Sequence, residues 1–183
     1  MLELETPHLT LRLGTAVEPT PQALQAGFEQ YKVAHEHPDC PFKAYRDTVL
    51  SIYFEGQLGR PYGFFDIYPK GADASVGHCN IHPRFCPPAE RQLFYGMPEK
   101  PRHGSVEMEI GWATKAPHRR KGYASEAAAR LVQYAFEQFE LPLVVACTEK
   151  ENTASMRVMQ KIGMRLMERE DGIGVVGVAE NPA

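Results

Sequence analysis

A run of basic residues that ends in glycine, Arg119–Gly122, is the part of the sequence best suited to bind an anion. It connects a strand predicted over 106–114 to a helix predicted over 122–139. The first turn of a helix presents N–H groups without partners in the helix, and glycine lets the backbone approach a ligand closely. Basic side chains at this end oppose the helix dipole, so helix stability alone does not favour them. The junction predicts a phosphate-binding turn, with a solvated basic loop as the alternative.

Two common phosphate motifs do not account for this junction. The pattern G-x-x-x-x-G-K-[ST] occurs nowhere in the chain. A literal G-x-G-x-x-G is formed by Gly172, Gly174 and Gly177, but only six residues follow it. A dinucleotide site needs a helix and a further strand after this motif. We therefore interpret the stretch as a C-terminal strand.

Two longer stretches, EIGWATKAPHRRKGYASEA and ENTASMRVMQKIGM, resemble the two signatures of the GNAT superfamily of N-acetyltransferases. The first signature (Arg or Gln, two residues, Gly, one residue, Gly or Ala) falls on Arg119, Gly122 and Ala124. The residues that match the second signature are Asn152, Ser155, Val158, Lys161, Gly163 and Met164. Within the superfamily, these two stretches most resemble the sequences of the branch that includes the ribosomal-protein N-terminal acetyltransferases. The similarity covers residues 107–169, about a third of the chain.

The resemblance implies that the chain binds acetyl-CoA as a cosubstrate and transfers the acetyl group to a primary amine by direct attack. The acceptor would be a protein N-terminus, a peptide or a small-molecule amine. A backbone N–H of the 106–114 strand would face the thioester oxygen, where negative charge grows during attack. The residues implied in acetyl-CoA binding are Ala113, Thr114, Arg119, Arg120, Lys121, Gly122, Tyr123, Ala124, Asn152 and Ser155. Two alternatives stay open: a non-catalytic acyl-CoA-binding or regulatory module, and an enzyme that transfers a longer acyl group.

Glu109 is the first candidate for a general base, because the resemblance places a catalytic glutamate of some family members at this position. Glu107 lies two residues away and would share its strand face. Two neighbouring carboxylates raise one another's pKa, which helps a base to work near neutral pH. The alternatives are a chain of ordered waters as the base, or carboxylates that face solvent or pair with Arg102 or Lys100.

Ser155 is the candidate acid for the leaving thiolate, either directly or through a water. Relatives often carry a tyrosine one residue beyond the position of Val158, where this chain has Met159. The thiol of coenzyme A has modest acidity, so a dedicated acid is not required. Cys147 could suggest a covalent cysteine, but its apolar strand predicts a buried structural thiol.

A further motif, H-C-x2-H-x3-C, is formed by His78, Cys79, His82 and Cys86. These residue types suit zinc, but the spacing matches no familiar site, so we expect strand or pocket lining and no metal. The two histidines stay open as weak alternative bases. The aromatic residues Tyr45, Tyr53 and Phe54 are expected in the core, with a substrate pocket as the alternative.

Apolar periodicity and turn residues predict the other elements. Further strands are predicted over 8–13, 62–68, 76–82 and 141–148. Further helices are predicted over 21–34, 42–53 and 152–162. Asn152 is the expected N-cap of the last helix, the apolar run 141–148 suggests burial on both strand faces, and Asp171-Gly172 predicts a hairpin.

Residues 83–104 contain five prolines and two glycines and predict a long irregular loop. The order of elements predicts one domain over residues 1–183. Its class is α/β (α+β), with a mixed, mostly antiparallel twisted sheet flanked by helices, as in the GNAT-type fold that the resemblance implies.

Composition narrows the classes of partner. The 183 residues carry a net charge of −3, whereas nucleic-acid-binding domains usually have a basic excess, so no nucleic-acid partner is expected. The segment MLELETPHLTLRL lacks the pattern of a signal peptide and no stretch resembles a membrane span, so we expect a cytoplasmic protein with reduced cysteines. Relatives are often dimers, which leaves a homodimer open.

Overall fold

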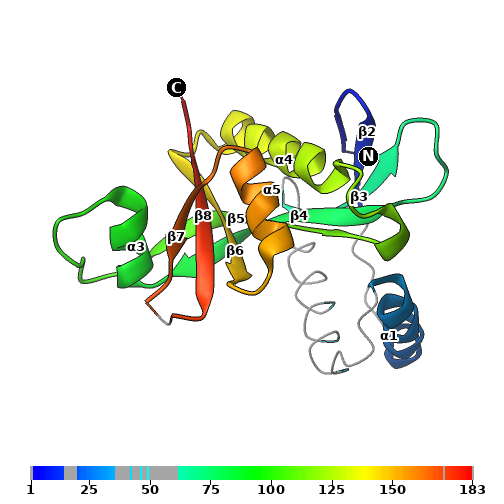
Figure 1. Cartoon of the computed structure of the whole chain (residues 1–183), viewed down its shortest axis with the longest axis horizontal. Helices are drawn as coiled ribbons and strands as arrows, with labels where there is room; N and C mark the ends of the chain where they lie inside the picture. Colours follow the sequence, from blue (N-terminus) through cyan, green and yellow to red (C-terminus); the bar gives the residue numbers. More distant parts are fainter. Residues whose placement is uncertain are drawn as a thin grey trace. The chain divides into compact units, whose positions relative to one another are not determined.

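The computed structural model describes residues 2–14, 20–35, 42, 46, 49, 62–170 and 172–182. Its strands form one mixed sheet in the order β1-β2-β3-β4-β5-β6-β8-β7 (Figure 1). The β5–β6 pair is parallel, and the pairs β1–β2, β2–β3, β6–β8 and β7–β8 are antiparallel. The predicted α/β class with a mostly antiparallel sheet is confirmed. The chain divides into two compact units, Met1–Asn80 with Trp112–Tyr123 and Ile81–Gly111 with Ala124–Ala183, and the prediction of one domain stays a prediction.

The first unit contains an antiparallel arrangement of β1 (Glu3–Glu5), β2 (Leu9–Leu13) and β3 (Gly63–Pro69). Alternating residues of β2 and β3 are fully buried, as the alternation in the sequence predicted. The short strand β1 was not predicted. Helix α1 (Pro21–His35) agrees with the expected range. The helix predicted over 42–53 lies largely outside the described residues, and its aromatic residues Tyr45, Tyr53 and Phe54 lie outside them altogether.

The prediction of an irregular loop over 83–104 is wrong for its first half. Strand β4 (Gly77–Cys86) extends past the predicted end, and helix α3 (Pro88–Tyr95) follows it after one residue. A proline in the first turn of a helix loses no hydrogen bond, and glycine at the end adopts the left-handed conformation easily. Gly96 does so with φ 59°, and its N–H donates to the carbonyl of Gln92. The prolines and glycine that suggested a loop are therefore the start and stop signals of α3.

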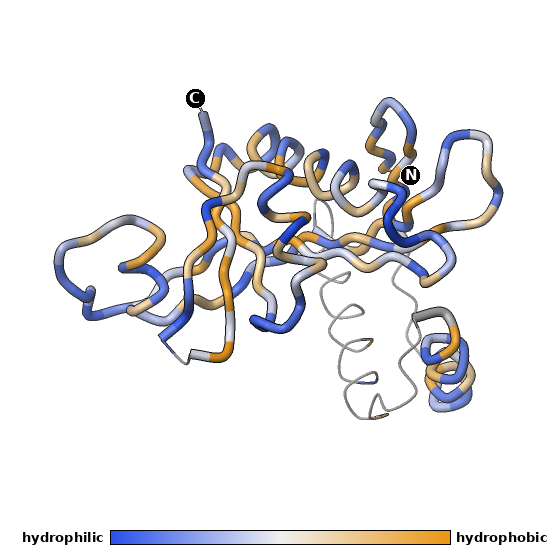
Figure 2. Tube along the Cα trace, in the orientation of Figure 1, coloured by the Kyte–Doolittle hydropathy of each residue, from blue (hydrophilic) through white to orange (hydrophobic). Residues whose placement is uncertain are grey.

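The second unit contains β6 (Leu143–Glu149), β7 (Arg165–Glu168) and β8 (Gly174–Glu180), together with β4 from Ile81 on and β5 (Ser105–Thr114) up to Gly111. In the parallel pair, Glu109 of β5 lies opposite Val145 of β6. The first four residues of β6 are buried, which confirms burial on both faces for this part of the strand. Strands β7 and β8 form the predicted hairpin, and Gly174 and Gly177 of the glycine motif lie in the C-terminal strand β8, with Gly172 just before it. Strands β6 and β8 themselves consist largely of hydrophobic residues (Figure 2).

Helices cover both faces of this part of the sheet. Helix α5 (Thr153–Lys161) packs where β8 has Gly177, since a Cβ there would lie 3.0 Å from Sδ of Met159 and of Met164. Neighbouring residues of a strand point to opposite faces. On the other face, Phe94 of α3 packs in a buried cluster with Cys86, Leu143, Val145, Val176 and Val178. Helix α3 is thus anchored in the core.

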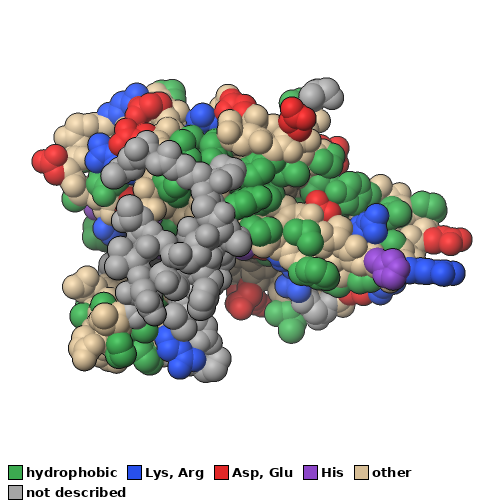
Figure 3. Space-filling model, turned by 180° about the vertical axis from the view of Figure 1, so that it is seen from behind, with side chains coloured by type: hydrophobic (Ala, Val, Ile, Leu, Met, Phe, Trp, Pro, Cys, Tyr) green, Lys and Arg blue, Asp and Glu red, His purple; other side chains and the backbone are tan. Residues whose placement is uncertain are grey.

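Charged side chains of both signs are interspersed over the face drawn in Figure 3, which agrees with the small net charge. This even mixture forms no large field of one sign among the described residues on that face. None of the helices in the described part of the chain has the length and apolarity that a membrane span needs.

Candidate functional site

The predicted phosphate-binding turn leads directly into helix α4 (Tyr123–Phe139). A short 3₁₀ turn, Ala116–His118, precedes it, and Arg120 and Gly122 both have positive φ, 61° and 87°. Such values are easy for glycine and uncommon for arginine, so the backbone is held in a specific turn. The residues from Arg119 to Gly122 are exposed, and Arg119 Nε donates to the carbonyl oxygen of Thr114 at 3.4 Å. The turn therefore presents basic side chains beside the first turn of an α-helix.

Ala113 and Thr114 form the end of β5 just before this turn, and both are half-buried. A Cβ on Gly77 would lie 2.2 Å from the carbonyl oxygen of Ala113. Glycine at position 77 is thus required for the close approach of β4 to the end of β5. The contact between these two segments continues at Lys115, whose backbone N–H donates to the Val76 carbonyl oxygen at 2.9 Å.

Asn152 and Ser155 meet at the start of α5. The side-chain oxygen of Asn152 accepts a hydrogen bond from the Ser155 N–H at 3.1 Å, which confirms Asn152 as the N-cap. Asn152 is exposed and Ser155 is half-buried. The capping role is therefore established for Asn152, while cofactor binding by both residues and the acid role of Ser155 stay predictions.

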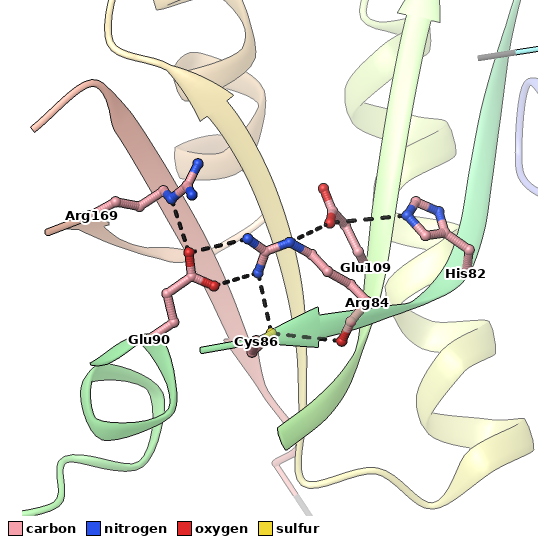
Figure 4. A network of polar contacts seen from close by, with 6 residues as sticks. All are labelled: His82, Arg84, Cys86, Glu90, Glu109 and Arg169. Atoms are coloured by element: carbon pink, nitrogen blue, oxygen red, sulfur yellow. Dashed lines mark hydrogen bonds and ion pairs between the residues drawn. The ribbon is translucent and has the colours of Figure 1, made fainter. Parts of the chain in front are cut away.

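Glu109 belongs to a chain of ion pairs within the second unit (Figure 4). Its Oε2 lies 3.0 Å from Nε of Arg84 and 4.0 Å from Nε2 of His82, both on β4. The two terminal nitrogens of Arg84 donate to the two carboxylate oxygens of Glu90 on α3, with 3.1 Å between Nη2 and Oε1. Glu90 Oε1 also lies 2.9 Å from Nε of Arg169, after β7. We call the four ionised residues Glu109, Arg84, Glu90 and Arg169 the Arg84 network.

Burial is the main cause of a raised pKa at Glu109. Arg84 and His82 act against this rise, Glu90 adds to it, and a backbone hydrogen bond from Cys147 lowers the pKa again. The neighbouring carboxylate that contributes most is Glu90, whereas the sequence predicted Glu107 for this role. A carboxylate with a raised pKa is suited to accept a proton near neutral pH.

Glu107 shares the strand face of Glu109 but has a different partner. It is 4% exposed, and both of its carboxylate oxygens accept a hydrogen bond from the Tyr95 hydroxyl at 3.1 Å. Although 44% of Tyr95 is exposed, burial of its hydroxyl and the Glu107 carboxylate raise the pKa of Tyr95 to about 12. The expected alternatives for these carboxylates were solvent, Arg102 or Lys100. Glu107 is buried rather than solvent-facing, Glu109 pairs with Arg84, and Lys100 pairs with Glu170.

The three described cysteines are free thiols. Cys147 is half-buried rather than buried, and burial, followed by the Glu109 carboxylate, raises its pKa to about 12. Burial also raises the pKa of Cys86 to about 11. Such thiols carry almost no thiolate near neutral pH, so they are poor nucleophiles. Among the residues that the structure describes, no three His, Cys, Asp or Glu side chains are grouped to hold a metal ion.

The sequence missed Arg84, Glu90 and Arg169. Of the residues in Figure 4, the sequence had singled out Glu109 as the candidate base and His82 as a weak alternative base. A signal was present for Glu90, because Pro88 followed by an acidic residue in the first turn is a common helix start. Arg84 and Arg169 had no such signal, since only the folded chain brings them to Glu90.

A family model described as an acetyltransferase (GNAT) domain matches residues 23–165, well over half of the chain. Among curated proteins, the uncharacterized N-acetyltransferase YnaD of Bacillus subtilis (strain 168) is 45% identical over 62 residues. That match covers 34% of this chain and 36% of the relative. The chain spans about a third to about half of the length of the curated relatives it matches.

Solved acetyltransferase structures are similar in fold to this chain over nearly its whole length. An acetyltransferase from Agrobacterium tumefaciens has a TM-score of 0.67 and 22% identity, with 99% of this chain and 95% of that chain covered. The ribosomal-protein α-N-acetyltransferase RimL, solved in complex with coenzyme A, has a TM-score of 0.59 and 13% identity, with 98% of each chain covered. At these identities the two structures support the fold.

Proposed function

This chain belongs to the acetyltransferase (GNAT) domain family, and we propose that it transfers the acetyl group of acetyl-CoA to a primary amine by direct attack. The acceptor is a protein N-terminus or a small-molecule amine. RimL, with the same fold, was solved with coenzyme A and is named for acetylation of a protein α-amine. The expected cytoplasmic location and the open question of a homodimer belong to this proposal.

The observation that carries the proposal is the turn that joins β5 to α4. It combines a left-handed Gly122, exposed basic side chains and the first turn of a helix. This combination suits a diphosphate, because the first turn of a helix offers N–H groups without helical partners and the basic side chains beside it add positive charge. Ala113 and Thr114 would bind the pantetheine arm, and Tyr123, Ala124, Asn152 and Ser155 complete the proposed set.

Glu109 is the proposed general base, since only a neutral amine can attack. A lysine-like amine with a pKa near 10.4 is neutral in about one molecule in 2,500 at pH 7, whereas an α-amine near 7.7–8.0 is neutral in about a tenth. A base is therefore more important for a lysine-like acceptor. The raised pKa of Glu109 suits this role.

An acceptor screen tests the proposal. The protein is incubated with acetyl-CoA and a panel of peptide N-termini, polyamines, aminoglycosides and amino acids, and free thiol and product mass are followed. We expect thiol release together with a product heavier by one acetyl group. Binding of coenzyme A without transfer to any amine would instead favour an acyl-CoA-binding module. Longer acyl-CoA donors in the same assay test chain-length preference.

Substitution of Gly122 tests the turn. Gly122→Ala adds a side chain at a residue with φ 87°, where space is open but the backbone conformation is strained. Because the free variant can relieve a strain of about 1–3 kcal/mol by leaving this turn conformation, we expect coenzyme A affinity to fall by about 5- to 150-fold. Calorimetric titration of coenzyme A measures it. Gly71→Ala, also at positive φ (79°) and in open space, is the matched control and should leave the affinity unchanged; equal losses in both variants would contradict the role of the turn.

Substitution of Cys147 tests direct attack. Because the Cys147 thiol has a pKa of about 12, it cannot serve as an efficient acceptor of the acetyl group. Cys147→Ser should retain turnover within about twofold of the original protein. Steady-state kinetics with the best acceptor of the screen measures it. Loss of turnover with intact coenzyme A affinity would favour a covalent acyl-enzyme.

A further inference from the structure

The Arg84 network places one guanidinium between two carboxylates, and this arrangement carries an inference that rests on the proposed function. We propose that Arg84 and Glu90 are positioning residues, which hold the Glu109 carboxylate in place and divide the positive charge of Arg84 between Glu109 and Glu90. We do not propose that either side chain contacts the reacting atoms. They act through Glu109.

The contacts of Arg84 are unequal. Only its Nε faces Glu109, at 3.0 Å, while both terminal nitrogens donate to Glu90 (Figure 4). A pair of parallel hydrogen bonds fixes the plane of a guanidinium group. Since the Glu90 side chain is only 4% exposed, it offers a fixed partner. Glu90 on α3 therefore fixes the direction of the Arg84 Nε–H. That direction in turn fixes the position of the Glu109 carboxylate.

The helix that carries Glu90 is itself fixed. Phe94 on α3 is 3% exposed and packs in the buried cluster with Val176 and Val178 of β8. Arg84 is on β4 and Glu109 is on β5, both within the second unit. A side chain held by a packed helix and neighbouring strands is more precisely placed than one held by a loop.

The division of charge also affects the chemistry of Glu109. If Arg84 faced Glu109 alone, its full charge would favour the ionised carboxylate and make it a weak base. Glu90 offsets part of that charge, and Arg169, 2.9 Å from Glu90, balances Glu90 in turn. All four buried or half-buried ions thus have a partner of opposite charge, which limits the cost of burying them.

Two variants with opposite expected effects test the proposal. Glu90→Gln removes a negative charge near Glu109, so the acid limb of the kcat–pH profile should move down by about one pH unit. Arg84→Gln removes the cation and should move that limb up by about one pH unit. The other groups that face Glu109, His82 of β4 and Cys147 of β6, are unchanged. A purely structural role would lower kcat or stability without opposite displacements of the limb.

Two further variants separate the outcomes. Glu170→Gln makes the same chemical change on an exposed carboxylate paired with Lys100, so its profile should match the original protein. Glu90→Asp keeps the charge and should leave the limb in place; a displacement equal to that of Glu90→Gln would overturn the proposal, even if Arg84→Gln does not fold. Unchanged limbs in folded Glu90→Gln and Arg84→Gln would overturn it as well.

A direct titration distinguishes this inference from the proposed function. The Glu109 carboxyl carbon, assigned by its loss in Glu109→Gln, is followed by NMR in protein labelled with ¹³C-glutamate. We expect its pKa to fall in Glu90→Gln and to rise in Arg84→Gln, whether or not an acceptor is known. A protein that acetylates no amine but shows both changes would refute the enzyme function and keep the network. A protein that acetylates an amine but shows neither change in the Glu109 pKa would support the enzyme function and refute the role of the network.

Discussion

Replacement of Glu109 by glutamine should reduce kcat about 100- to 10,000-fold with a lysine-like acceptor, the usual effect of losing a general base. Glutamine keeps the size of the side chain and an oxygen that can accept from Arg84 Nε, but it cannot accept a proton. The loss should be smaller for an α-amine acceptor, because a larger fraction of that amine is already neutral. Steady-state kinetics with one acceptor of each kind measures the difference.

The pH profile gives a second measure of the same substitution. Burial raises the Glu109 pKa, and only the ionised carboxylate, which predominates above that pKa, can accept a proton. Turnover of the original protein should therefore fall as the pH is lowered through that pKa, and Glu109→Gln should lack this acid limb.

Control variants identify the carboxylate responsible. Glu107→Gln changes the other candidate base, whose two oxygens accept from the Tyr95 hydroxyl. Because this carboxylate is nearly inaccessible, we expect its loss to affect stability more than the pH profile. If Glu107→Gln removes the acid limb and Glu109→Gln does not, Glu107 is the base. If neither substitution changes the limb, a water chain serves.

The elements with a regular apolar stripe could be predicted from the sequence. In α4, the apolar positions that suggested a helix include Ala127, Ala128 and Leu131, and all three are fully buried. In α5, the start was predictable because an asparagine N-cap satisfies a backbone N–H by itself. These signals are local, so they do not depend on which elements become neighbours.

The Arg84 network could not be predicted for the opposite reason. Arg84 and Glu90 lay in a stretch whose prolines suggested a loop, and charged residues in a loop are expected to face solvent. The packing of Phe94 against β6 and β8 holds α3 on the sheet, where Glu90 is buried beside Arg169. The sequence therefore identified Glu109 but not the groups that determine its environment.

Substitution of Gly77 is expected to have a large effect on stability. Gly77→Ala would place a Cβ 2.2 Å from the Ala113 carbonyl oxygen and 2.9 Å from the Thr114 Cα, and both of these are backbone atoms. Backbone cannot move aside as a flexible side chain can, so the end of β5 has to shift. We expect a loss of about 3 kcal/mol in the free energy of unfolding, at the upper end of overpacking effects. For a chain of this length the melting temperature should fall by about 6–12 °C.

A second glycine provides the matched control. The nearest atom to a Cβ on Gly14 is the Phe64 carbonyl oxygen at 3.5 Å, an ordinary contact, so Gly14→Ala should change the melting temperature little. Thermal unfolding of both variants, with and without coenzyme A, separates two effects. Since Ala113 and Thr114 also belong to the proposed cofactor site, Gly77→Ala should lose stabilisation by coenzyme A in addition to intrinsic stability. If it melts early but is stabilised by coenzyme A as much as Gly14→Ala, the end of β5 does not bind the cofactor.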